Sequence, residues 1–140
     1  MNEFDDFRPL DFFKLACELN ESIGKFNSSG SSVKRNIFGR IYYAVFLFVW
    51  EWLLKHTNYR SNPKMDHSKI PEYIRNQGPF SNEVNKDVSK NFNILKRLRH
   101  QSDYYLEVPP LYSFEYSKWI FKDVSYALAL AQDIFVAFGE

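Results

Sequence analysis

The sequence has little cysteine, histidine or glycine, and each shortage excludes a class of protein. The single cysteine, Cys17, cannot form an internal disulfide, and the acidic start lacks the pattern of a signal peptide, so we expect a cytoplasmic protein. The three histidines, His56, His67 and His100, match no standard spacing for metal ligands. Glycine-rich phosphate loops and the common hydrolase motifs are also missing. We therefore expect neither a metal nor a cofactor.

An excess of one charge and an apolar run of membrane length are lacking as well. Eighteen Lys and Arg residues oppose 17 Asp and Glu residues, which leaves a net charge of +1. Any attraction to nucleic acid must therefore be local. The most apolar run, 41–54, is shorter than the about 20 residues of a membrane span, contains Glu51, and follows Arg40. We expect no membrane contact and assign this run to the middle of a helical bundle.

Helical periodicity of apolar residues extends over most of the chain, and the alternation typical of strands is absent. With 140 residues and 45% hydrophobic content, the chain can form one domain over 1–140. Ser31 and Ser32 are candidate N-caps of the second helix, and Ser81 of the fourth. The sequence predicts an all-α up-and-down bundle of four main helices plus one short helix. The predicted helices are 9–26, 33–57, 67–77 (the short one), 82–104 and 113–138.

The fourth predicted helix is amphipathic and ends in a basic cluster. Its apolar stripe comprises Val84, Val88, Asn91, Leu95 and Leu98. The basic side chains on the rest of its surface are Lys90, Lys96, Arg97, Arg99 and His100. Since no other chemical signature is present, any catalytic role must rest on this basic end.

An ordered set of short motifs gives the chain a resemblance to a known family. Residues 40–46, Arg-Ile-Tyr-Tyr-Ala-Val-Phe, resemble the Arg-x-Tyr-Tyr-Ala-x-Phe signature of HEPN domains (higher eukaryotes and prokaryotes nucleotide-binding). His67 is similar to a later feature of that family, and Arg99 to Tyr104 matches its Arg-x-x-x-Asp-Tyr ending. The resemblance spans about residues 10–138, and it implies a helical bundle.

The resemblance implies a protein of a prokaryotic toxin–antitoxin, CRISPR-linked or phage-defence system. Many HEPN members are metal-independent ribonucleases that act as dimers, with an Arg followed four to six residues later by a His in a shared cleft. Others pair with a nucleotidyltransferase. In this chain Arg97 falls at the Arg position, and Ser102 stands where the His is expected. A homodimer that contacts RNA or a nucleotide is therefore the expectation.

The serine matters because Ser has no pKa near neutrality and cannot replace imidazole in proton transfer. His100 is the nearby candidate. At about 100° per residue, it lies roughly 60° from Arg97 and roughly 160° from Ser102 around the helix. His100 is thus either the catalytic partner of Arg97 or a surface histidine that the negative end of a helix favours.

Six further residues are candidates for nucleic-acid or nucleotide binding: Arg40, Lys96, Arg99, Ser102, Asp103 and Tyr104. Arg99 either contacts a phosphate or forms an ion pair with Asp103, four residues later. Arg40 is expected to have Asp103 or a ligand as its partner. Tyr104 either stacks on a base or covers the core.

Three functions remain open at this point. The first is an HEPN-like domain that contacts RNA or a nucleotide and acts as a metal-independent ribonuclease. The second is a non-catalytic module that binds a nucleotidyltransferase or an effector protein, which Ser102 and the near-neutral charge favour. The third is a purely structural helical subunit. The aromatic content of 19% fits either a Phe-rich core or a partner surface.

Overall fold

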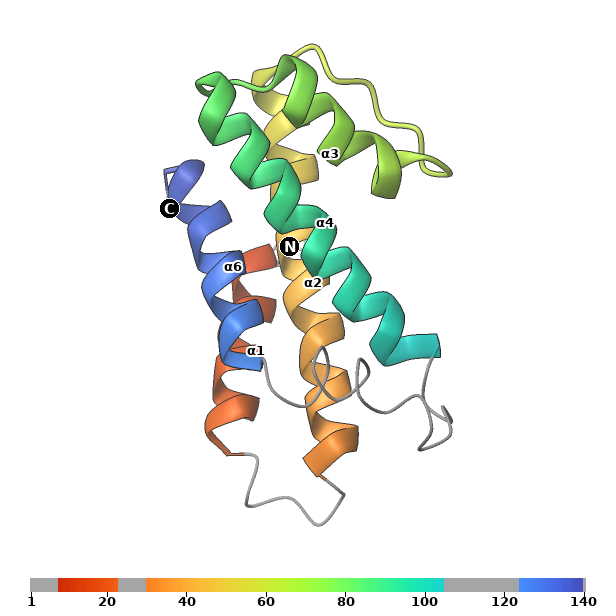
Figure 1. Ribbon diagram of the computed structural model, residues 1–140, viewed down its shortest axis with the longest axis vertical. Coiled ribbons are helices and arrows are strands. Elements are labelled where there is room, and N and C mark those ends of the chain that lie inside the picture. The colour runs from red at the N-terminus through yellow and green to blue at the C-terminus, as the bar shows by residue number, and fades with distance from the viewer. Residues whose placement is uncertain (1–7, 23–29, 105–123, 140) are drawn as a thin grey trace, which may run out of the picture.

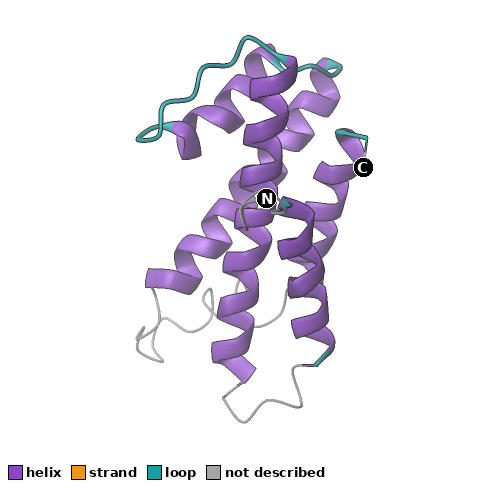
Figure 2. Ribbon diagram, turned by 180° about the vertical axis from the view of Figure 1, so that it is seen from behind, coloured by secondary structure: helices purple, strands orange, loops and turns teal. Residues whose placement is uncertain are grey.

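The computed structural model describes residues 8–22, 30–104 and 124–139, and every regular element in these ranges is an α-helix. The helices are α1 (Pro9–Glu21), α2 (Gly30–His56), α3 (Asp66–Gln77), α4 (Asn82–Tyr104) and α6 (Val124–Ala137). Successive long helices α1, α2, α4 and α6 alternate in direction, and α3 lies at one end beside the start of α4 (Figure 1). The same arrangement is seen from behind in Figure 2. The predicted all-α bundle is confirmed.

Helix α2 is the centre of the bundle, because it packs against α1, α4 and α6. Its fully or nearly fully buried side chains are Ile37, Phe38, Ile41, Tyr42, Ala44, Val45, Val49 and Leu53. They contact buried side chains of the neighbouring helices, such as Phe92 of α4 and Phe135 of α6. However, Tyr43 is 40% exposed and Leu54 is 39% exposed. The apolar run thus lies in the middle of the bundle, as predicted, but part of its surface remains exposed.

The same helix is, over Arg35–His56, the one stretch in the described ranges that is long and apolar enough to cross a membrane, so the apolar stretch is longer than the run 41–54 considered from the sequence. Half of its most apolar window is buried against other helices. A core helix of a soluble protein has the same length and composition, so this property is weak evidence for a membrane span and agrees with a place in the bundle core.

Two helix ends differ from the sequence-based boundaries. Helix α1 ends at Glu21, short of the predicted residue 26, and the Ser22 N–H closes it with a 3.1 Å hydrogen bond to the carbonyl of Glu18. Helix α2 begins at Gly30, so Ser31 and Ser32 lie inside the helix instead of capping it. Serine costs only about 0.5 kcal/mol in a helix relative to Ala, which the packing of a long central helix offsets. The predicted start of the last helix, residue 113, lies outside the described residues.

Helix α4 buries a face that is slightly rotated from the predicted stripe. Val84 is 38% exposed, and the neighbouring Asn85 is buried in its place. The Asn85 amide donates to the carbonyls of Gly78 and Phe80, at 3.2 and 3.1 Å, and its oxygen accepts from the Phe80 N–H. Asn85 is buried because its side chain pairs with the backbone groups of Gly78 and Phe80 in the turn before α4. Ser81 does cap α4, as predicted, through a 3.3 Å bond from the Val84 N–H.

Helix α3 is attached to α4 by a second buried hydrogen bond. The Ser89 hydroxyl donates to the carbonyl of Pro71, at 2.8 Å. Both Ser89 and Pro71 are buried. This bond and the Asn85 contacts fix the position of α3, and with it the position of His67 near its first turn.

A buried carboxylate organises the turn that precedes α3. Asp66 is 3% exposed and accepts hydrogen bonds from the Tyr59 hydroxyl, the Ser61 hydroxyl and the Asn62 N–H. Burial alone would raise the pKa of Asp66, but these donors and the neighbouring imidazole hold the pKa below its ordinary value. We call Asp66 and these three donors the Asp66 turn.

Candidate anion-binding site

One surface hollow of about 590 Å³ lies where the second half of α4, the middle of α2 and the start of α3 meet. Its lining residues are Tyr42, His67, Asn93, Lys96, Arg97, Arg99 and His100. These include three cations and two imidazoles, with no carboxylate. We call this hollow the basic pocket. Its charge makes it a site for anions.

His67 is held on two sides within the basic pocket. Its Nδ1 lies 2.6 Å from the hydroxyl oxygen of Tyr42, and its ring stacks on Phe46 with 4.1 Å between centroids. Tyr42 is fully buried, which raises its pKa, so the phenol keeps its proton. That proton has no other acceptor among the described residues. We therefore assign Tyr42 as the donor and His67 Nδ1 as the acceptor, which places the imidazole hydrogen on Nε2.

The environment of His67 keeps its imidazole neutral. Burial is the main cause of a lowered pKa, and the cations Arg99 and Lys96 lower it further, while the carboxylate of Asp66 acts in the opposite direction. A neutral imidazole with its hydrogen on Nε2 can donate a hydrogen bond to an anion in the pocket. His67 is therefore suited to bind rather than to take up a proton.

Arg99 connects α4 to α2 at the edge of the basic pocket. Its Nη2 donates a 2.9 Å hydrogen bond to the hydroxyl of Tyr43. Its guanidinium carbon lies 4.6 Å from the ring centroid of Tyr43 and 5.3 Å from that of Tyr42, within the range of cation–π interactions. The side chain of Asp103 lies outside the described residues, so the expected Arg99–Asp103 ion pair stays a prediction.

Ser102 does not reach the basic pocket. It is 1% exposed, and its hydroxyl donates a 2.8 Å hydrogen bond to the carbonyl of Leu98, one turn earlier. The helical angle of roughly 160° from His100 explains why the two side chains lie on opposite faces. Ser102 is therefore not part of the lining of the basic pocket, and a role in binding stays a prediction.

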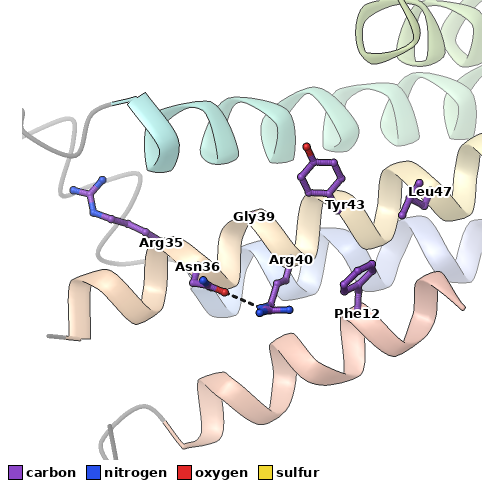
Figure 3. A pocket seen from close by; sticks show the side chains of 7 residues that line it. All are labelled: Phe12, Arg35, Asn36, Gly39, Arg40, Tyr43 and Leu47. Carbon is purple, nitrogen blue, oxygen red and sulfur yellow. Dashed lines mark hydrogen bonds between the residues drawn. The ribbon is translucent and has the colours of Figure 1, made fainter. Parts of the chain in front are cut away.

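Arg40 lines a different hollow, of about 530 Å³, between α1 and α2. In Figure 3 Arg40 points toward α1 and Phe12, whereas Tyr43 points toward α4. The Nε of Arg40 donates a 2.7 Å hydrogen bond to Asn36, one turn earlier. Arg40 is therefore separate from the basic pocket, and its role as a binding residue stays a prediction. Its expected partner Asp103, and Tyr104, have side chains outside the described residues.

Four of the predicted site residues do come together in the basic pocket, namely Lys96, Arg97, Arg99 and His100. The pocket adds Tyr42, His67 and Asn93, which sequence reasoning did not select as site residues. A signal for two of them was present, because Tyr42 and His67 both belong to the motifs of the family resemblance. Asn93 lies four residues before Arg97 and so shares its helix face.

No family model matches the chain, and no curated protein or solved structure matches it. The family resemblance therefore stays a prediction. Within the ranges that the structure describes, no group of three or more His, Cys, Asp or Glu side chains is placed to hold a metal ion.

Proposed function

We propose that the basic pocket contacts the phosphate backbone of RNA and that the protein is a metal-independent ribonuclease. The observation that carries this proposal is that His67 and His100 line the same hollow as Lys96, Arg97 and Arg99. Cleavage of RNA by its own 2′-hydroxyl needs a proton carrier and groups that stabilise the charge of the phosphate. Both kinds of group are present in this pocket.

The residues divide these roles by their environment. His100 takes the proton of the 2′-hydroxyl as the 2′-oxygen bonds to phosphorus, and then gives a proton to the 5′-oxygen as its bond to phosphorus breaks. The products are a 2′,3′-cyclic phosphate and a 5′-hydroxyl. Arg97 stabilises the pentavalent phosphate, and His67 donates its Nε2 hydrogen to a phosphate oxygen.

The motif set supports a wider setting for this activity. Resemblance to HEPN domains favours a homodimer in the cytoplasm of a prokaryote, as part of a toxin–antitoxin, CRISPR-linked or phage-defence system. The support is the ordered run of residues 40–46, His67 and residues 99–104.

A cleavage assay on single-stranded RNA with excess chelator tests the proposal. We expect His100→Ala and Arg97→Ala each to reduce the cleavage rate by about 10² or more. His56→Ala is the matched control, because His56 contacts the Trp52 ring at the end of α2 and lies outside the pocket lining. An RNA with 2′-deoxy nucleotides should resist cleavage. Inactive wild-type protein, or full activity of His100→Ala, would refute the mechanism.

A non-catalytic binding module is the second candidate, and the inward side chain of Ser102 favours it. The residue at the position of the family histidine is buried and hydrogen-bonded to Leu98. In this alternative the basic pocket holds RNA or a nucleotide without cleaving it, and the domain pairs with a nucleotidyltransferase or an effector protein. RNA binding by anisotropy, with no cleavage by the wild type, would identify this case.

A further inference from the structure

A second hollow continues from the basic pocket along α4. It has a volume of about 640 Å³, and it shares Asn93 and Arg97 with the basic pocket. Its lining also includes Arg75 of α3, Lys86 and Lys90 of α4, and Tyr126 of α6. The two hollows therefore adjoin each other at Asn93 and Arg97, and neither lining contains a carboxylate; we call the two together the depression.

The depression follows a single face of α4. Lys86, Lys90, Asn93, Arg97 and His100 succeed one another at spacings of four, three, four and three residues, which places them in one row along the helix. We call this row the α4 track. With a rise of about 1.5 Å per residue, it is about 21 Å long.

The cations that line the second hollow and not the basic pocket are Arg75, Lys86 and Lys90. In the described ranges the one ion pair joins Lys55 and Glu51, on α2. Arg75, Lys86 and Lys90 therefore form no ion pair with any described carboxylate. In a chain of net charge +1, such a row of cations is a local concentration that an external anion would neutralise.

The other groups in the second hollow suit a nucleic acid better than an acidic peptide. Tyr126 is 42% exposed, and its ring offers a stacking surface for a base. The exposed amide of Asn93 can donate to and accept from a base edge or a phosphate. A row of cations beside an aromatic ring is the arrangement with which proteins hold single strands.

We propose that one RNA strand lies along the α4 track, from His100 to Lys86, with flanking contacts to Arg75 and Tyr126. This inference rests on the proposed function of the basic pocket and adds the form of the ligand. The ligand is a single strand of about six stacked nucleotides, since each stacked nucleotide adds about 3.4 Å to the length. A mononucleotide would fill only one end of the track.

Binding as a function of oligonucleotide length tests this inference. We use fluorescence anisotropy with labelled 2′-O-methyl uridine oligonucleotides of two to ten nucleotides, which lack the attacking hydroxyl. For the wild type, affinity should rise up to about six nucleotides and then level off. Lys86→Ala/Lys90→Ala should weaken hexamer binding about tenfold or more and lower the salt dependence by about 1.4 in log–log slope. Its affinity for the dinucleotide should be unchanged.

The matched control is Lys14→Ala/Lys64→Ala, which removes the same charge from exposed positions outside both hollows. It should bind the hexamer as the wild type does. Equal hexamer affinity for the track variant and the control would overturn the α4 track, whereas dinucleotide binding that Arg97→Ala abolishes would still support the basic pocket. Wild-type protein that binds no oligonucleotide would overturn both. If the track variant loses affinity only for a labelled poly-glutamate peptide and not for RNA, the track binds acidic protein and the inference is wrong.

Discussion

The Asp66 turn and the basic pocket contain consecutive residues, Asp66 and His67, but they differ in how their polar groups are paired. Asp66 is buried, and its oxygens accept from Tyr59, Ser61 and Asn62. His67, the next residue, faces a hollow in which cations are present and carboxylates are absent. The number of polar groups therefore does not distinguish a binding site from a structural network. The balance between donors and acceptors does.

This balance decides what each region contributes. A satisfied buried network stabilises the fold, and removal of one member leaves the others without partners. An excess of donors in a solvated pocket contributes little to the fold, but it becomes favourable when an anion binds. Substitutions should therefore affect folding at the Asp66 turn and binding at the basic pocket.

Asp66→Ala should have the largest effect on stability. It leaves the buried Tyr59 hydroxyl and two further donors without their acceptor, so we expect the free energy of unfolding to fall by about 2–4 kcal/mol. Urea denaturation monitored by circular dichroism measures this free energy. Asp87→Ala, at an exposed position of α4, is the control and should change stability by less than about 0.5 kcal/mol. A loss at Asp66 no greater than at Asp87 would remove the contrast between the two regions.

Tyr42→Phe should have an intermediate effect on stability, because Tyr42 is buried in the core and also lines the basic pocket. The change removes the hydrogen bond to His67 Nδ1 and should cost about 1 kcal/mol. Tyr43→Phe also removes a hydrogen bond, from Arg99, but at an exposed position, so its cost should be smaller. Thermal unfolding of the two variants side by side makes the comparison. Equal melting temperatures would mean that the buried Tyr42–His67 bond contributes no more than the exposed Arg99–Tyr43 bond.

The smallest expected effect is a dependence of stability on pH that His67 causes. Its pKa in the folded protein is below the ordinary value of about 6.5, so at mildly acidic pH the unfolded chain binds more protons. The free energy of unfolding should therefore rise with pH and level off above about pH 7. His67→Gln should remove this slope, and His56→Gln should keep it. The lowered pKa of Asp66 acts at lower pH, since its contribution is lost as pH falls through that pKa.

Local sequence patterns predicted the helices and the clustering of Lys96, Arg97, Arg99 and His100, because these features depend on the period of one helix. The contact of Tyr42 with His67 joins residues 25 apart and depends on how α3 crosses the bundle. A local sequence pattern does not determine the angle at which α3 crosses the bundle. Inward-facing Asn85 was missed for a similar reason, since its partners belong to the backbone of the preceding turn.

The attachment of α3 to α4 has a consequence for how the protein unfolds. Helix α3 is short and mostly polar, and it is fastened to α4 by the Ser89–Pro71 bond and the Asn85 contacts. An opening of α3 that breaks these bonds also exposes buried groups of α4, which couples the two helices into one cooperative unit. Their amide hydrogens should thus exchange with solvent together. His67 and Lys96 consequently line the same pocket as long as α3 stays attached to α4.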